Sequence, residues 1–563
     1  MTPLLELQQL AIGFKGSEGF SNAVKQSSFT LHRGELVAVV GESGSGKSVT
    51  ALSILGLLPP AAKVSGRILF HEKNKPPVDL LSITGNELRK TRGNNISMIF
   101  QEPMTALNPV FTVGDQVMEA LQLHKKISRA EARQRTIKLF SQVRLPDPEN
   151  TLKKYPHQMS GGQKQRVMIA MAMSCDPSVL IADEPTTALD VTVQKTILEL
   201  IRELQIKNNM GVLLITHDLG VVADIADTIV VMLKGEIVEQ GPAKTILSNP
   251  QHPYTKALLA CRPAGHPKNK RLPVVSDFMN VSSTVPQNKS TGLIEPDLPG
   301  ETVLQVENLS VHFPLKKNIF GKPITYFNAV DDVSFTVRQG EILGLVGESG
   351  CGKTTLGRTI LQLVPATSGR ILLHGKDITT IQPSTLRGMR KDLQVVFQDP
   401  YGSLNPRLSI GDSITEPLQV HGLLANKKAR KEKAISLLEK VNLNGDHFNR
   451  YPHEFSGGQR QRICIARALI TDPSFLIFDE SVSALDVSVQ AQVLNLLNDF
   501  RKEFNFSALF ISHDLSVVHY TCDRIMVMQK GKIVETGSAE QVYNEPVNEY
   551  TKKLIAAIPG KEL

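Results

Sequence analysis

The amino-acid sequence predicts an α/β protein in which two similar domains follow each other in one chain. Blocks of the first half recur in the same order in the second half, so that Glu184, for example, corresponds to Glu480. Each half also contains short apolar runs bounded by Gly or Asp, such as LVAVVGESG in the first and ILGLVGESG in the second. Runs of this kind are typical of buried parallel strands that alternate with helices.

The domain boundaries follow from the length of the repeat and from the composition between its copies. The repeat spans about 300 residues, so each copy is a whole domain and not one unit of a stacked array. Between the copies the chain is rich in Pro, Ser, Asn and Lys and lacks periodicity, as expected of a linker. We therefore expect a first domain at residues 1–261, a linker at 262–302 and a second domain at 303–563.

Composition excludes several classes of protein. Hydrophobic residues at 41% and charged residues at 21% are ordinary for a soluble globular chain. The apolar runs are far shorter than the ~20 residues that a membrane span needs. The N-terminus has neither the basic segment nor the apolar segment of a secretory signal. We therefore expect a cytoplasmic chain without a membrane-spanning helix.

Cysteine spacing and net charge limit the choice of cofactors and partners. The five cysteines are scattered without any C-x-x-C spacing, which argues against zinc, disulfides and an iron–sulfur cluster. A net charge of +8 is compatible with an anionic partner such as nucleic acid. However, the basic residues are spread over segments that read as solvated faces of surface helices. We therefore expect no nucleic-acid partner.

Both copies contain a phosphate-binding loop of the form G-x-x-x-x-G-K-[ST], directly after an apolar strand and before a helix-compatible segment. The glycines let backbone N–H groups turn toward phosphates, the Lys reaches the β- and γ-phosphates, and the hydroxyl ligates Mg²⁺. A Gly-rich structural turn is the alternative, but two matches at equivalent places favour nucleotide binding. The expected residues are Gly41, Glu42, Ser43, Gly44, Ser45, Gly46, Lys47, Ser48 and Val49, and Gly347, Glu348, Ser349, Gly350, Cys351, Gly352, Lys353, Thr354 and Thr355.

Downstream of each loop, an apolar strand ends in an Asp-Glu pair. Asp183 and Asp479 are expected to hold Mg²⁺, while Glu184 and Glu480 can polarise the attacking water. Strand ends commonly carry solvated acids, so the pair alone is weak support. Its distance from a phosphate-binding loop favours the catalytic interpretation.

A Ser-Gly-Gly-Gln tetrapeptide in each copy precedes a helix-like segment, so backbone donors and a helix N-terminus can face an anion there. The alternative is a Gly-Gly turn that caps a buried helix. We expect both tetrapeptides to bind nucleotide. They comprise Ser160, Gly161, Gly162 and Gln163, and Ser456, Gly457, Gly458 and Gln459.

The order of these motifs, together with Gln101, His217 and their counterparts, resembles the ATP-binding cassette (ABC) family over nearly the whole chain twice. The resemblance implies two tandem ABC-type P-loop NTPase domains, each a RecA-like core with a helical subdomain and a small antiparallel β subdomain. It implies that the domains pair head to tail within the chain, so that each ATP lies between one domain's phosphate-binding loop and the other's signature tetrapeptide.

The same resemblance implies individual roles. Gln101 and Gln398 would sense Mg²⁺, which Ser48, Thr354 and the two strand-end aspartates also hold. His217 and His513 would contact the γ-phosphate, and Asp190 and Asp486 would link the two sites. Phe14 and Phe313 are candidates to stack on adenine. The resemblance-implied residues beyond the motifs above are thus Phe14, Gln101, Asp190, His217, Phe313, Gln398, Asp486 and His513.

Further blocks resemble one subfamily, the ATPases of dipeptide, oligopeptide and nickel importers. These blocks include IFQEPMTALNPVFTVGDQ, YPHQMSGGQKQRV and YPHEFSGGQRQRI, and the tails HPYTKALL and EYTKKL. The resemblance implies C-terminal extensions, import of glutathione, dipeptides or oligopeptides, two integral-membrane permeases and a periplasmic solute-binding protein. It places the chain peripherally on the cytoplasmic face of the inner membrane, with ATP and Mg²⁺ as cofactors.

Two departures from the subfamily pattern are relevant. Ser481 replaces the usual Pro after Glu480, which removes a φ restriction and makes the second site the weaker candidate. Only Cys261 stands where relatives carry a Cys-rich segment, so no iron–sulfur cluster is expected. The competing hypothesis is a soluble tandem ABC ATPase that acts on ribosomes or DNA. The exact cargo, any regulatory role of the tails and the relative activity of the two sites stay open.

Overall fold

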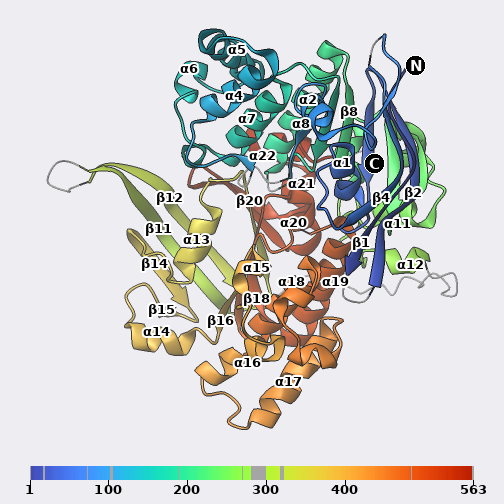
Figure 1. Cartoon of the computed structure of the whole chain (residues 1–563). Coiled ribbons are helices and arrows are strands. Elements are labelled where there is room, and N and C mark those ends of the chain that lie inside the picture. The colour runs from blue at the N-terminus through green and yellow to red at the C-terminus, as the bar shows by residue number, and fades with distance from the viewer. Residues whose placement is uncertain are drawn as a thin grey trace.

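The computed structural model describes residues 2–16, 19–72, 74–101, 106–187, 189–268, 270–279, 300–317, 323–483 and 485–560. Each half contains a mostly parallel six-stranded sheet and a separate antiparallel sheet. Each half also has a group of helices between its glutamine (Gln101 or Gln398) and its Ser-Gly-Gly-Gln tetrapeptide (Figure 1). Among the described residues, no helix combines the length and apolarity that crossing a bilayer requires.

The six-stranded sheet of the first half has the strand order β10-β9-β3-β8-β7-β6. All neighbours pair in parallel except β10, which is antiparallel to β9. The strands are β3 (Leu36–Val40), β6 (Ile96–Ile99), β7 (Val179–Asp183), β8 (Gly211–Thr216), β9 (Thr228–Leu233) and β10 (Glu236–Pro242).

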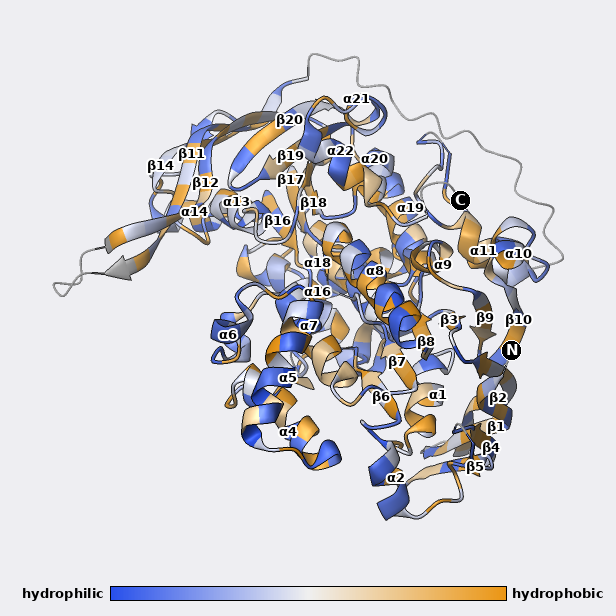
Figure 2. Ribbon diagram, turned by 90° about the horizontal axis from the view of Figure 1, so that it is seen from above, coloured by the Kyte–Doolittle hydropathy of each residue, from blue (hydrophilic) through white to orange (hydrophobic). Residues whose placement is uncertain are grey.

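Alternating side chains of these strands are buried on opposite faces of the sheet. In β3, Val37 and Val39 pack in the cluster that contains the antiparallel sheet and α1 (Lys47–Ile54). Leu36, Ala38 and Val40 pack instead with the helices on the other face. Because both faces are buried, the strands are uniformly apolar, and Figure 2 shows them in orange inside bluer surface helices.

The antiparallel sheet of the first half has the order β2-β1-β4-β5. It comprises β1 (Pro3–Gly16), β2 (Gly19–His32), β4 (Ala62–Phe70) and β5 (Val78–Asp79). The helices are α2 (Gly85–Thr91), α4 (Val113–Lys125), α5 (Arg129–Gln142), α6 (Pro148–Thr151), α7 (Gly161–Met173), α8 (Val191–Asn208), α9 (Leu219–Ala223), α10 (Ala243–Ser248), α11 (Pro253–Ala260) and α12 (Val275–Met279).

The second half repeats this arrangement. Its large sheet has the order β16-β17-β18-β13-β19-β20, and its antiparallel sheet has the order β12-β11-β14-β15. The strands are β11 (Thr302–Lys317), β12 (Pro323–Arg338), β13 (Ile342–Val346), β14 (Ser368–Leu373), β15 (Lys376–Asp377), β16 (Leu393–Val396), β17 (Phe475–Asp479), β18 (Ser507–Ser512), β19 (Arg524–Gln529) and β20 (Lys532–Ser538). The helices are α13 (Lys353–Ile360), α14 (Pro383–Met389), α15 (Pro400–Ser403), α16 (Ile410–Val420), α17 (Lys427–Lys440), α18 (Gly457–Leu469), α19 (Val487–Phe504), α20 (Leu515–Thr521), α21 (Ala539–Asn544) and α22 (Glu549–Ala556).

The first part of the expected linker packs against the second half. Leu272 is fully buried in the second half's hydrophobic core, and so is Cys261 just before the linker. The backbone of Leu272 exchanges two hydrogen bonds with the side chain of Asn495 on α19, at 3.0 and 2.8 Å. Residues 280–299, the remaining part of the expected linker up to Gly300, lie outside the described residues.

The Asn495 side chain should therefore hold the segment 270–279 on the second half. The Asn495→Ala variant leaves a buried N–H and a buried C=O of Leu272 unpaired, and each such group costs about 1–3 kcal/mol. We expect trypsin to cleave after Lys270 or Arg271 roughly tenfold or more faster in this variant, because local opening exposes the segment.

The rate is measured by mass spectrometry under native conditions. Asn544→Ala is the matched control, since Asn544 is an exposed residue whose side chain donates to the neighbouring Glu540 side chain. Equal cleavage rates in the two variants would contradict the prediction.

Candidate nucleotide-binding sites

The functional side chains of the first half meet along the carboxyl edge of its parallel sheet. The phosphate-binding loop follows β3, the Asp-Glu pair ends β7, His217 follows β8, and Gln101 lies two residues beyond β6. Since β8 lies between β3 and β7, and β6 flanks β7, all four motifs emerge side by side. Ligands of open α/β sheets bind at this edge.

The phosphate-binding loop of the first half curls around its own lysine. Lys47 is buried, and its Nζ donates to the carbonyl oxygens of Gly41 at 2.6 Å and Glu42 at 2.8 Å. Burial lowers the pKa of the Lys47 ammonium, although acidic neighbours oppose the shift. Gly46 has a φ of 100°, and a Cβ there would lie 2.5 Å from the carbonyl oxygen of Ala23, so glycine is required.

A hydroxyl and a carboxylate meet beside this loop. The Ser48 hydroxyl donates to the Asp183 carboxylate at 3.0 Å. Burial raises the pKa of the Asp183 carboxyl to about 6, and the hydrogen bond from Ser48 offsets only part of that effect. Two oxygen ligands next to a phosphate-binding loop suit a hard cation such as Mg²⁺, which prefers oxygen.

Glu184 is held from three sides. Its carboxylate accepts from Gln101 Nε2 at 3.0 Å and from the Thr187 hydroxyl at 2.8 Å, and His217 Nδ1 lies 3.4 Å away. Burial raises the pKa of the Glu184 carboxyl, but the hydrogen bonds from His217 and Thr187 and the charges of His217 and Lys47 together outweigh it, so the pKa falls to about 2. Glu184 is therefore ionised at neutral pH.

The backbone of Glu184 is also unusual. Its φ of 45° lies in the left-handed region, where residues other than glycine are uncommon. The Glu184 N–H donates to the carbonyl of Ile215 on β8 at 3.0 Å, which holds this conformation. The strand thus ends sharply at Glu184.

The second half reproduces the site with small differences. Gln398 Nε2 lies 2.9 Å from the Glu480 carboxylate, His513 Nδ1 lies 3.6 Å from it, and Lys353 Nζ lies 3.8 Å from it. Burial raises the pKa of the Glu480 carboxyl, but His513 and Lys353 together outweigh burial, and the pKa is lowered. The Thr354 hydroxyl donates to Asp479 at 3.1 Å.

Ser481 leaves the second site's backbone unchanged. Glu480 has a φ of 49°, against 45° for Glu184, and its N–H donates to Ile511 at 3.0 Å. The buried Ser481 hydroxyl has no hydrogen-bond partner among the described residues. The expected loss of restraint at this residue therefore does not displace the glutamate.

The two signature tetrapeptides begin α7 and α18 as predicted from their sequence. Ser160 caps α7 by accepting from Gln163 N at 3.3 Å, and Ser456 caps α18 through Gln459 N at 3.4 Å. In the described part of the chain, no hydrogen bond or ion pair joins a signature residue to the opposite phosphate-binding loop.

Direct contact between the halves occurs at the first phosphate-binding loop. Asp486 of the second half accepts from Ser43 N at 3.0 Å, and the Ser488 hydroxyl donates to the Glu42 carboxylate. Asp190, the counterpart of Asp486, instead caps its own helix α8 through Val193 N at 2.9 Å. The two halves therefore engage each other asymmetrically.

The histidines of both halves line one shared cavity. This cavity, of about 110 Å³, lies between the halves and is lined by Glu184 and His217 from the first half and by Ser483, Leu485 and His513 from the second. The two expected sites are therefore neighbours across one interface.

The expected adenine-stacking residues lie near the phosphate-binding loops. Phe14 on β1 is partly buried, and Phe313 on β11 is exposed. Their strands pair with β2 and β12, whose residues Ala23 and Ala329 lie against the glycines of the two loops. The sequence analysis did not identify Thr187, Tyr254 or Tyr550 as site residues. For the two tyrosines, the available signal was that a tyrosine recurs at the equivalent place of both tails.

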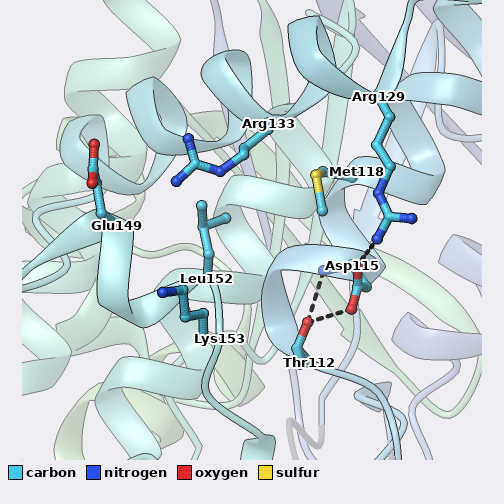
Figure 3. Close-up of a pocket in the computed structure, with 8 residues that line it drawn as sticks. All are labelled: Thr112, Asp115, Met118, Arg129, Arg133, Glu149, Leu152 and Lys153. Carbon is cyan, nitrogen blue, oxygen red and sulfur yellow. Dashed lines mark hydrogen bonds and ion pairs between the residues drawn. The ribbon is translucent and has the colours of Figure 1, made fainter.

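A separate pocket of about 260 Å³ lies on the helices of the first half, away from the phosphate-binding loop (Figure 3). Its lining mixes cations and anions, with Asp115 accepting from Thr112 and paired with Arg129 at 3.2 Å. The lining residues are Thr112, Asp115, Met118, Arg129, Arg133, Glu149, Leu152 and Lys153.

Comparison with known proteins agrees with this geometry. The model of the ABC transporter family matches residues 24–187 and 330–483. The model of the oligopeptide/dipeptide transporter C-terminal region matches residues 238–281 and 534–562. Both family models therefore match twice, once in each half.

Similar curated proteins include the glutathione import ATP-binding proteins of Escherichia coli (strain K12) and Shigella sonnei (strain Ss046). Each is 49% identical over 566 residues, which is 99% of this chain and 90% of the relative. Among solved structures, a dimeric bacterial ABC transporter cassette aligns at 25% identity with a TM-score of 0.38, over 42% of this chain and 98% of its own.

These matches confirm the predicted family, the tandem α/β fold and the assignment as an ATPase. The similarity extends over both halves and both tails. The chain belongs to the ABC transporter family of ATP-binding proteins, as a tandem member with the oligopeptide/dipeptide transporter C-terminal region in each half.

Proposed function

We propose that this protein hydrolyses ATP to drive the import of glutathione or similar small peptides through a binding-protein-dependent transporter. The observation that carries the proposal is the pair of equivalent sites, each with an ionised glutamate held beside a phosphate-binding loop by a glutamine and a histidine. The peptide class of the cargo is supported by the two C-terminal regions and by the names of the 49% identical relatives.

In this proposal Glu184 and Glu480 activate the attacking water in their own sites. A carboxylate with a lowered pKa is ionised at pH 7 and can accept a hydrogen bond from that water. Gln101 and His217 orient Glu184, and Gln398 and His513 orient Glu480. His217 and His513 would also contact the γ-phosphate of the ATP bound in their own sites.

The residues fit a phosphate ligand with a bound cation. Gly44 and Gly350 leave open space where a Cβ would stand, so their backbones can approach phosphates closely. Lys47 and Lys353 would exchange their loop carbonyls for phosphate oxygens. Mg²⁺, when bound with ATP, supplies positive charge on the β- and γ-phosphate oxygens. We assign its protein ligands to Ser48, Gln101 and Asp183 in one site and Thr354, Gln398 and Asp479 in the other.

Closure of the halves on ATP would complete both sites. We propose that Ser456 to Gln459 face the first phosphate-binding loop and Ser160 to Gln163 face the second, because helix N-termini attract phosphate. Phe14 and Phe313 would then stack on adenine. The contact of Asp486 with Ser43 supports this head-to-tail pairing.

The division of the chain is proposed as 1–261, 262–302 and 303–563, with the first part of the linker packed on the second half. The chain would act peripherally at the cytoplasmic face of the inner membrane, without a nucleic-acid partner or an iron–sulfur cluster. The ribosome or DNA alternative is not favoured, because it does not account for the transporter C-terminal regions.

The permease partners are proposed to dock on the helices that follow the glutamine of each half. In the first half, the exposed Val110 and Phe111 lie next to the pocket residue Thr112, directly before α4. Arg407 and Leu408 stand at the equivalent places of the second half, which suits two different permease subunits.

The first of two predictions from the proposed function concerns the catalytic glutamates. Glu184→Gln and Glu480→Gln keep the side-chain shape but remove the negative charge, so the altered site should lose about 10²–10⁴-fold in hydrolysis rate. MgATP binding should persist. If the two sites hydrolyse ATP in alternation, each single variant should retain well under half of the ATPase activity. The double variant should trap two nucleotides.

The measurement is ATP turnover of the reconstituted transporter together with nucleotide occupancy. Glu199→Gln, an exposed glutamate on α8, is the control that should leave turnover unchanged. A normal rate in one single variant beside an inactive other would show that only one site is catalytic.

The second prediction concerns the permease surface. Phe111 is 54% exposed, and a charge there should weaken apolar contact with a permease without reaching the catalytic residues. Phe111→Asp should therefore keep the ATPase activity of the isolated protein within about twofold and abolish its stimulation by the permeases.

Leu123→Asp is the matched control, because Leu123 is 71% exposed at the far end of α4. Both activities are measured on the isolated protein and in proteoliposomes. Retained stimulation in Phe111→Asp, or equal loss in the control, would place the permease elsewhere.

A further inference from the structure

Each half ends in a tail helix whose tyrosine contacts the phosphate-binding loop of the same half. The Tyr254 hydroxyl on α11 accepts from the N–H of Glu42 at 3.0 Å. The Tyr550 hydroxyl on α22 accepts from the N–H of Glu348, also at 3.0 Å. Glu42 and Glu348 directly follow the first glycine of each loop, so both contacts hold the same point of the loop.

Both tyrosines are buried, so water does not easily replace their hydroxyls. Tyr254 has 0% of its surface exposed and Tyr550 has 8%. Burial also raises the pKa of both phenols, which therefore stay neutral at pH 7. The loop N–H loses its partner if the hydroxyl is removed.

The same tail helices pack against the opposite half. Helix α11 contacts α19, and α22 contacts α8. Lys195 on α8 donates to the carbonyl of Ala556 at the end of α22, at 3.0 Å. Each tail therefore lies between its own phosphate-binding loop and the long helix of the other half.

At the first phosphate-binding loop, the tail of the first half and helix α19 of the second half contact adjacent residues. Helix α19 begins directly after Asp486, which accepts from Ser43 N, and Ser488 in its first turn bonds the Glu42 side chain. The tail of the first half holds the backbone of Glu42 through Tyr254. A shift of α19 relative to the first half would act on the loop directly and through α11.

We propose that Tyr254 and Tyr550 are positioning residues of the two phosphate-binding loops, through which each tail couples MgATP binding in its own half to the position of the opposite half. The inference rests on the proposed ATPase function, and it assigns the C-terminal regions a role in nucleotide binding. The tyrosines do not contact the reacting atoms and act through the loop backbone.

The first experiment compares Tyr254→Phe, Tyr550→Phe and Tyr520→Phe in the full chain. Tyr520 is the matched control, because its buried hydroxyl donates to the carbonyl of Lys270 at 3.1 Å and lies on α20, outside the loops. Hydrogen exchange is followed without nucleotide on peptides that contain Glu42 or Glu348. Loss of one hydrogen bond should speed exchange of the loop amide about 3- to 10-fold in the matching tyrosine variant alone.

The same variants are then tested for MgATP binding and turnover. Each loop variant should raise the KM for MgATP by about 3- to 10-fold and leave kcat within about twofold, because the lost contact supports binding of substrate and transition state alike. Tyr520→Phe should leave both constants unchanged. Unchanged loop exchange and KM in both loop variants, with thermal stability lowered as in Tyr520→Phe, would make the tyrosines packing residues only.

A double-mutant cycle tests the coupling to the opposite half. Tyr254→Phe and Ser488→Ala act on the same loop residue, so their effects on MgATP affinity should be non-additive. The Thr192 hydroxyl, equivalent to Ser488, has no hydrogen-bond partner in the part of the chain that the structure describes, so Thr192→Val and Tyr550→Phe should be additive. Additivity in both cycles would overturn the coupling, whereas absence of ATPase activity in the unaltered protein would instead refute the proposed function.

Discussion

The geometry of each site depends on one strand inserted between two others. Strand β8 pairs in parallel with β3 on one side and β7 on the other, with Thr216 beside Val40 and Ile215 beside Asp183. Since the register of both pairings is fixed by backbone hydrogen bonds, the residues that follow these strands emerge at one level. A shift of β8 by one residue would turn its buried side chains to the wrong faces and would move His217 away from Glu184.

The same arrangement explains how a carboxylate stays ionised in a partly buried place. Burial raises the pKa of the Asp183 carboxyl, which ends β7, and the hydrogen bond from Ser48 offsets only part of that effect. Burial also raises the pKa of Glu184, one residue later, but the left-handed turn points its carboxylate toward His217 and Thr187, and these contacts together with the charge of Lys47 lower the pKa. The pKa values of two adjacent acids therefore shift in opposite directions, because the chain changes direction between them at the strand end.

The parts of the site that the sequence predicts are those encoded by local spacing. The phosphate-binding loops, the Asp-Glu pairs and the signature helices are each contiguous, and the parallel edge brings Gln101 and His217 beside them. The contact of Tyr254 with Glu42 joins residues 212 positions apart, and no local pattern reports it. The packing of Leu272 on Asn495 was likewise hidden, because a Pro-rich segment without periodicity reads as a linker even where it is held by two side-chain hydrogen bonds.

The asymmetry between the halves arises because equivalent residues have different hydrogen-bond partners. Asp190 caps α8, whereas Asp486 leaves α19 without a side-chain cap and contacts Ser43 of the opposite loop. An aspartate cap contributes about 1 kcal/mol, and a hydrogen bond to a charged group contributes about 1.5–3 kcal/mol. The two arrangements of this aspartate therefore differ by about 0.5–2 kcal/mol, so a modest gain at one phosphate-binding loop suffices to exchange them. Both aspartates begin the helices against which the tails pack. Such an exchange would therefore form a contact at one phosphate-binding loop and break the contact at the other.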